Sequence, residues 1–274
     1  MPAHQEAAHW TIADLDFSRI DLDAVRNDET LFYLACSASF VESGSDMYTR
    51  NLIEYFQGDA EVTQWLSAHW EAEELQHGQA LRAYVQHVWP EFDWEPAYRD
   101  FLAEYAGYCK VELLAPSRAL EMSARCVVET GTATYYRALA RATTEPVFID
   151  LALRIAADEV SHYKHFYRFF RRYRDQERVG RTRVFGTVAH RIWALRSEDA
   201  DCALRHIASH RDPACAGDKA WLRRLTSRVS RTVSRNLNPQ FTLKMLMRPL
   251  DLPPRLESML RVPVEQFMQR LFLR

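Results

Sequence analysis

The chain has 274 residues, of which 47% are hydrophobic and 26% are charged, and its formal net charge is -2 at pH 7. These proportions are ordinary for a soluble globular protein with a sizeable core, in one large domain or one and a half. No apolar stretch approaches the roughly 20 residues that span a bilayer, and the N-terminus lacks the basic start and apolar run of a signal peptide. We therefore expect a cytoplasmic protein, either free or peripheral to a membrane, whose five cysteines are reduced thiols.

The net charge conceals two opposite halves. Residues 1–150 contain 10 Lys and Arg against 25 Asp and Glu, whereas residues 151–274 contain 25 against 12. The basic half is expected to neutralise the chain's own acidic half or to contact an acidic carrier protein or anionic lipid surface. Nucleic acid is disfavoured, because no recognised binding motif accompanies the arginines. The apolar and basic segments at 241–252 and 262–274 are expected to dock on the core, with a membrane surface or an acyl tunnel as alternatives.

Abundant Ala, Leu, Arg and Glu, only eight glycines and no strong strand alternation predict an all-α fold. Asp28 and Asp59 are typical N-cap residues, Pro116 and Pro146 suit a first helical turn, and Gly58 suits a break between helices. Four long helices are therefore expected, over residues 28–57, 59–89, 116–142 and 145 to about 173.

Three regions follow from these helices. Residues 1–27 are expected to form an N-terminal arm, and its apolar residues should pack over the bundle. Residues 28–175 form the helical bundle, and residues 176–274 form a basic extension of shorter helices that packs on it. The connection over residues 90–115 is expected to contain a helix of its own, and its length permits a crossover between helical pairs.

Each long helix carries an acidic residue near its middle: Glu42, Glu74, Glu129 and Glu159. At about 1.5 Å rise per residue, these carboxylates fall at nearly one level of a bundle. Two of the four are followed three residues later, on the same helix face, by a histidine: His77 and His162. Two glutamates from two helices plus a Glu-x-x-His pair from each of the other two are the ligands of a carboxylate-bridged dinuclear metal centre.

The spacing alone is a weak signal, because Glu6 and His9 repeat it in the polar N-terminal tail. The alternative interpretation is that the glutamates are solvated charges on helix faces. Glu42 and Glu129, however, lie in segments poor in other charges. Burying a lone carboxylate is costly unless it is paired or bound to a metal, so the four-part pattern favours the metal centre.

Residues beside the ligand candidates are given ordinary roles. Glu73 points about 100° away from Glu74 around the helix and is expected to be a solvated neighbour. His69 and His165 are expected to be core or surface histidines. The small residues around the first and third glutamates serve either close helix packing or a cavity for dioxygen and a substrate chain.

The order of these ligands resembles that of the ferritin-like di-iron carboxylate superfamily. The local strings EELQHGQAL and IAADEVSHYKHF most resemble the soluble acyl-carrier-protein desaturases. The resemblance covers about residues 28–174, and it implies a ferritin-like four-helix bundle with a crossover connection. It also implies a homodimer.

The resemblance implies roles for individual residues. Thr132 would lie near the oxygen-binding face, and Asp158 would lie just outside the ligands. The metals would be two iron ions, or one manganese and one iron. The implied ligands are Glu42 and Glu129 as terminal ligands, Glu74 and Glu159 as bridges, and His77 and His162 with one iron each.

The implied activity is that of an oxygen-dependent di-iron oxidoreductase, most plausibly a desaturase or hydroxylase of an acyl or other lipophilic chain. An external electron donor would be required, because no flavin or nicotinamide fingerprint appears. Iron oxidation and storage, peroxide reduction and a non-catalytic helical interaction module remain as alternatives. A radical-generating ribonucleotide-reductase subunit is disfavoured, because Leu81 stands where a tyrosine would be expected. The substrate, and the choice between desaturation, hydroxylation and N-oxidation, stay open.

Overall fold

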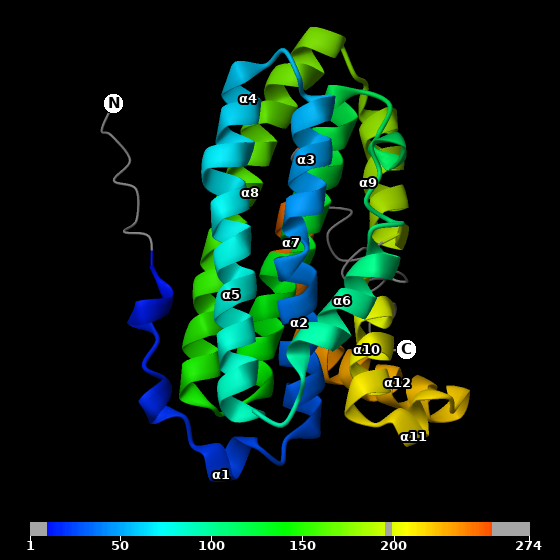
Figure 1. Ribbon diagram of the computed structural model, residues 1–274. Coiled ribbons are helices and arrows are strands. Elements are labelled where there is room, and N and C mark those ends of the chain that lie inside the picture. The colour runs from blue at the N-terminus through cyan, green and yellow to red at the C-terminus, as the bar shows by residue number, and fades with distance from the viewer. Residues whose placement is uncertain (1–9, 195–198, 254–274) are drawn as a thin grey trace.

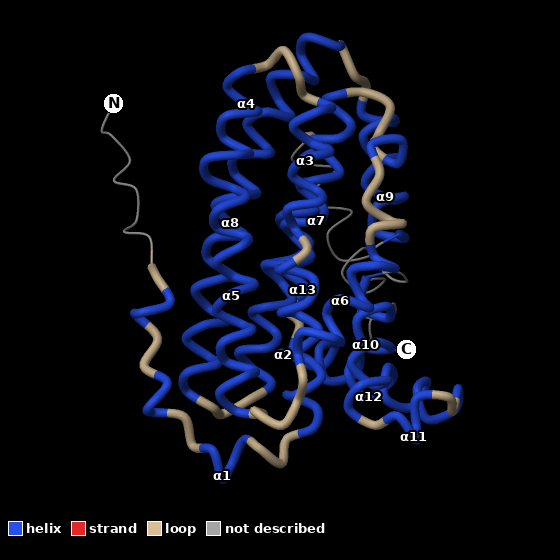
Figure 2. Tube along the Cα trace, in the orientation of Figure 1, coloured by secondary structure: helices blue, strands red, loops and turns tan. Residues whose placement is uncertain are grey.

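The computed structural model describes residues 10–194 and 199–253, and within these ranges every regular element is helical (Figure 2). Long helices run side by side as a bundle (Figure 1). The most extensive packing joins α7 to α8 and α2 to α5. These four helices are α2 (Glu29–Ser43), α5 (Glu71–Val88), α7 (Arg118–Ala142) and α8 (Pro146–Glu177).

The helix starts follow the predicted capping residues with one exception. Asp28 accepts a hydrogen bond from the third residue of α2, and Asp59 does the same for α4 (Ala60–Trp65). Pro146 occupies the first turn of α8 as predicted. The prediction for Pro116 is wrong, because Ser117 is the N-cap of α7 and places the proline just outside the helix.

The first two predicted helices are each interrupted. Gly44 separates α2 from α3 (Ser45–Tyr55). A π-helical segment, Leu66–Trp70, joins α4 to α5. Gly58 adopts a positive φ of 91° between α3 and α4, which is the break expected there. Neither interruption removes the mid-helix glutamates from the bundle.

α2 and α5 approach each other closely, and this contact explains one group of small residues. A Cβ added at Gly78 on α5 would lie 2.7 Å from the backbone nitrogen of Ser43 on α2. No side chain larger than hydrogen fits there without moving a backbone. Close helix packing therefore accounts for the small residues Gly78 and Ser43 at this contact.

The remaining segments cover the bundle. The N-terminal arm places short helical turns against α5 and α8 (Figure 1) and buries Trp10, Leu15 and Ile20, as expected. The connection between α5 and α7 contains a helix, as predicted. The elements outside the four long helices are, besides α3 and α4, Ile12–Asp14, Phe17–Arg19, α1 (Leu22–Val25), α6 (Trp94–Tyr105), Val111–Leu113, α9 (Arg181–Ala194), α10 (Asp199–Arg211), α11 (Pro213–Ala216), α12 (Lys219–Asn236), α13 (Pro239–Met247) and Arg248–Leu250.

The C-terminal extension docks on the bundle through apolar and ionic contacts. α9, α12 and α13 pack on α7, and α10 packs on α6 and α2. Leu243, Met245 and Leu246 are buried, which confirms docking for the 241–252 segment. The segment at 262–274 lies outside the described residues, and the division into three regions stays a prediction. None of the described helices combines the length and apolar composition that a membrane span needs.

Part of the basic charge of the extension is neutralised by the acidic half of the chain. Arg211 pairs with Glu91 at 2.7 Å, and His210 lies 2.8 Å from Asp100. Arg205 donates to both carboxylate oxygens of Glu104 on α6. These contacts join residues more than 100 positions apart and account for a share of the charge asymmetry of the sequence.

Candidate metal centre

Four helices bring the six predicted ligands together in the interior of the bundle. They form two groups, and the potential ligand atoms within each group all lie within 4.8 Å of one another. All six side chains are buried. Glu74 and Glu159 belong to both groups, as bridging carboxylates would. One group is Glu42, Glu74, His77 and Glu159, and the other is Glu74, Glu129, Glu159 and His162.

Each histidine turns its Nδ1 atom toward the carboxylates of its group. In the first group, His77 Nδ1 lies 3.4 Å from Glu159 Oε1 and 4.0 Å from Glu42 Oε2. In the second, His162 Nδ1 lies 3.2 Å from Glu74 Oε1 and 3.5 Å from Glu129 Oε2. The two imidazoles therefore present the same ring nitrogen to the interior.

The outward nitrogen of each histidine is held by a carboxylate from the other helix. His77 Nε2 lies 3.0 Å from Asp158 Oδ2, and His162 Nε2 lies 2.6 Å from Glu73 Oε2. The position of Asp158 just outside the ligands agrees with the sequence prediction. The prediction that Glu73 is a solvated neighbour is wrong. Its side chain points from α5 toward α8 rather than toward solvent, and only 16% of it is exposed.

Trp10 of the N-terminal arm completes the surroundings of His77. Its indole Nε1 donates a 2.6 Å hydrogen bond to Asp158 Oδ2. Its ring is parallel to the imidazole of His77, with centroids 6.1 Å apart. Gln76 donates to the carbonyl oxygen of Trp10 at 2.9 Å and fixes the arm there. The apolar pattern of the arm indicated packing, but nothing in it indicated this polar contact.

Two hydroxyl groups on α7 orient carboxylates of the centre. Thr132 Oγ1 donates to Glu159 Oε2 at 2.6 Å. The hydroxyl of Tyr136, one turn further along, donates to Glu42 Oε1. Tyr136 is buried, and the sequence did not mark it as a candidate. Each hydroxyl leaves the second oxygen of its carboxylate available.

The flanking histidines have the ordinary roles expected of them. His69 is exposed on the π-helical segment. His165 is half-buried, and its ring stacks on Trp65 with centroids 4.9 Å apart. Neither belongs to the two groups of potential ligands.

The unsatisfied atoms of the centre fit bound metal ions. The Nδ1 atoms of both histidines, both oxygens of Glu129 and Oε1 of Glu159 are buried without a hydrogen-bond partner. A buried polar atom without a partner costs about 1–3 kcal/mol, and bound metal ions would compensate this cost for the whole cluster. Carboxylate oxygens with imidazole nitrogens suit iron, manganese or zinc.

Without metal, the centre retains protons. Burial would lower the pKa of His77, but the hydrogen bond to Asp158 and the nearby carboxylate of Glu159 raise it to about 10. The pKa of Glu42 is raised well above its ordinary value by burial and then by the neighbouring carboxylates. Burial acts in the same direction on Glu159, but the nearby imidazoles of His162 and His77 hold its pKa below the usual range. Metal ions would displace the protons of the histidines and of the buried acids.

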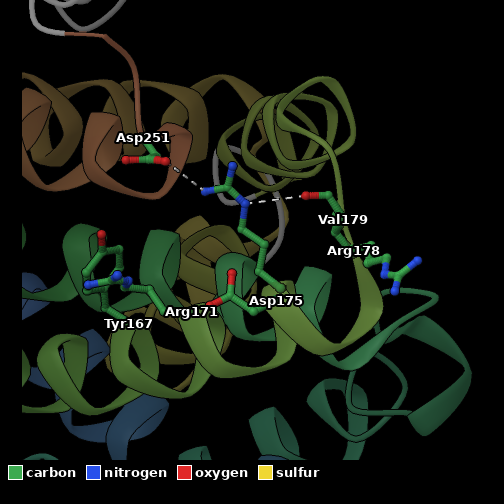
Figure 3. A pocket seen from close by; sticks show the side chains of 7 residues that line it. Tyr167, Arg171, Asp175, Arg178, Val179 and Asp251 are labelled. Atoms are coloured by element: carbon green, nitrogen blue, oxygen red, sulfur yellow. Dashed lines mark hydrogen bonds and ion pairs between the residues drawn. The ribbon is translucent and has the colours of Figure 1, made fainter.

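A separate pocket of about 380 Å³ lies near the C-terminal end of α8. Arg174 contacts Asp251 and the carbonyl oxygen of Val179, at 3.5 and 3.3 Å. Figure 3 shows both of these partners among the residues that line the pocket. Arg171 and Arg178 also line it. None of its lining residues is a predicted ligand, so this basic pocket is distinct from the metal centre.

No family model matches this chain, and no curated protein matches it either. The ferritin-like resemblance therefore rests on the residues of the chain and their arrangement. What the structure contributes is a buried cluster of carboxylates and histidines able to hold metal ions.

Proposed function

We propose that this chain is a ferritin-like, oxygen-activating di-iron oxidoreductase, a desaturase or hydroxylase of an acyl or other lipophilic chain. One observation carries the proposal: two groups of potential ligands share Glu74 and Glu159, and each group has one terminal glutamate and one histidine. This is the ligand arrangement of the di-iron carboxylate proteins. The resemblance of EELQHGQAL and IAADEVSHYKHF to the acyl-carrier-protein desaturases supplies the substrate class.

Two bound ferrous ions, or a manganese and iron pair, would supply the reduction of dioxygen and the removal of hydrogen from an unactivated carbon. The chain's own residues hold and orient them. Glu42 and Glu129 would each hold one ion, and Glu74 and Glu159, which belong to both groups, would be shared between the two ions. The histidine Nδ1 atoms complete each group, because the outer carboxylates engage the opposite ring nitrogen and so fix the tautomer.

The surrounding side chains control water and protons. Each ligand side chain is buried, so bulk water is excluded from the carboxylates. The hydroxyls of Thr132 and Tyr136 hold one oxygen each of Glu159 and Glu42. The protons that His77 and Glu42 carry without metal leave when the ions bind, so metal affinity rises with pH.

The proposal extends to partners. An external donor would supply two electrons, and the resemblance supports a cytoplasmic homodimer. The basic half of the chain would meet an acyl carrier protein or an anionic lipid surface, without a role in nucleic-acid binding. In support, α10 and α12 line a groove of about 660 Å³ with Arg205, Lys219, Arg223 and Arg231.

Anaerobic reconstitution with ferrous iron tests this function. About two irons per chain, followed by a near-ultraviolet absorption band when oxygen is admitted, are expected. Glu159→Ala and His162→Ala should lose iron and the band while their circular dichroism remains helical. Continued uptake and oxidation of iron far beyond this ratio would instead indicate iron storage, and a helical protein without bound metal would overturn the proposal.

The substrate class needs its own assay. The reconstituted protein, a chemical or enzymatic electron donor and oxygen are incubated with acyl chains attached to a carrier protein and with free acyl chains. A product lighter by two hydrogens or heavier by one oxygen supports desaturation or hydroxylation. Oxygen consumption without any change in either acyl substrate would remove acyl chains from the proposal.

A further inference from the structure

A third group of potential metal ligands joins α6 to α10, outside the proposed centre. Glu104 comes from α6, and Cys202 and His206 come from α10, one helical turn apart and therefore on one face. One potential ligand atom from each lies within 4.8 Å of the others. Cys202 is buried and is not part of a disulfide bond.

We propose that Glu104, Cys202 and His206 bind a divalent metal ion, by preference zinc, which fastens the C-terminal extension to the crossover helix. Thiolate sulfur, imidazole nitrogen and carboxylate oxygen are the donors that zinc takes in proteins. Three protein donors leave the fourth tetrahedral position to water.

The group is accessible and ready to bind. The side chain of Glu104 is 35% exposed and that of His206 is 19% exposed, so an ion reaches the site from solvent. His206 Nε2 already lies 3.0 Å from Glu104 Oε2.

Arg205 is compatible with an ion at this position. Its guanidinium donates to Glu104 Oε1 at 2.6 Å and Oε2 at 3.1 Å. A carboxylate has about four lone-pair sites, so this contact orients Glu104 without exhausting its oxygens. When zinc binds, Cys202 releases its thiol proton to solvent and His206 is neutral. Thiolate and carboxylate then balance the two positive charges of the ion, and Arg205 faces no excess positive charge.

The competing interpretation is a purely ionic interface between α6 and α10. The neighbouring pairs Arg211–Glu91 and His210–Asp100 have that character. They contain no sulfur. The buried thiol next to the imidazole and carboxylate is not needed for an ionic interface, whereas a zinc ion can take all three groups as ligands.

Cobalt is the first probe, because a thiolate bound to Co²⁺ gives a near-ultraviolet charge-transfer band that the carboxylates and histidines of the bundle cannot give. Titration of the metal-free full chain should produce this band in the wild-type protein and in Cys215→Ser, a matched change in the same extension. Cys202→Ser should lose it. Absence of the band in wild-type protein, or its loss in Cys215→Ser with retention in Cys202→Ser, would overturn the proposal.

Zinc-dependent unfolding tests the fastening role and is independent of the proposed oxidoreductase activity. Zinc should raise the unfolding temperature less in Cys202→Ser than in Cys215→Ser, because both variants keep the central ligands. His206→Gln, on a half-buried histidine, provides a second variant if the cysteine change prevents folding. It should lower zinc affinity in the same way. Equal zinc-dependent shifts in every variant would refute the site and leave the di-iron proposal unaffected.

Discussion

Glu73→Gln tests whether Glu73 orients the imidazole of His162, because the substitution leaves all six potential metal ligands in place. Glu73 Oε2 lies 2.6 Å from His162 Nε2, and no ligand atom is changed by the substitution. Glutamine keeps the length of the side chain and an acceptor oxygen, but it removes the negative charge. The substitution therefore weakens the contact that fixes the imidazole without emptying the space around it.

The size of the effect follows from that contact. A hydrogen bond to a charged group contributes about 1.5–3 kcal/mol and a neutral one about 0.5–1.5 kcal/mol. The difference is about 1–1.5 kcal/mol, which corresponds to roughly tenfold in affinity. Changes in groups that hold a metal-binding histidine typically lower metal affinity about 10- to 100-fold. We therefore expect a decrease of about tenfold for the ion bound by His162, with a smaller effect on the ion bound by His77.

Anaerobic calorimetric titration with ferrous iron measures the two affinities. Glu71→Gln is the matched control, because it removes the same charge two residues earlier on α5, and circular dichroism checks that both variants stay helical. Wild-type affinity in Glu73→Gln would show that Glu73 is only a solvated neighbour. Equal weakening in both variants would show a general effect of charge rather than a specific contact with His162.

Three further changes test packing, the arm and protonation. Gly78→Ala should destabilise the protein by about 1–3 kcal/mol in urea unfolding, because its Cβ would meet Ser43. Gly186→Ala, where the new Cβ lies in open space, should stabilise the protein by up to about 1 kcal/mol. The opposite order of stability would contradict the close contact between α2 and α5. Trp10→Phe keeps an aromatic ring but loses the hydrogen bond to Asp158. The affinity for ferrous iron in the calorimetric titration should therefore fall about tenfold. Unchanged affinity would show that Trp10 does not help to position Asp158. With chelator present, the free energy of unfolding should fall between pH 6.5 and about 10, because His77 in the folded protein keeps a proton that the unfolded chain releases. Urea denaturation at pH 7 and at pH 10 measures this difference. Greater stability at pH 10 would refute the prediction.

The features that local sequence could predict are those contained within one helix. Asp28, Asp59 and Pro146 begin helices because their effects act on the adjacent turn. The Glu-x-x-His spacing placed a carboxylate and an imidazole on one face for the same reason. Glu42 and Glu129 needed a longer argument, from mid-helix position and from the cost of burial, and the structure brings them into the two groups.

The features that sequence could not predict depend on which helix or arm lies beside which. His162 contacts Glu73, which lies 89 positions away in the sequence, and Trp10 contacts Asp158, which lies 148 positions away. A helical wheel gives the direction in which a side chain leaves its own helix, but not what stands in that direction. Tyr136 likewise became a partner of Glu42 only once α7 lay beside α2.

The crossed contacts make the functional unit longer than Glu-x-x-His. In both helices the residue immediately before the glutamate is acidic, Glu73 on α5 and Asp158 on α8, and each holds the histidine of the other helix. Each helix therefore supplies potential ligands of its own and also orients the histidine of its partner helix. Loss of either acid is expected to weaken the binding of an ion at the histidine of the other helix. The same criterion distinguishes the third occurrence of the spacing, because Glu6 is preceded by Gln5, an uncharged amide. An acid at that position lets one helix hold the histidine of the helix that faces it.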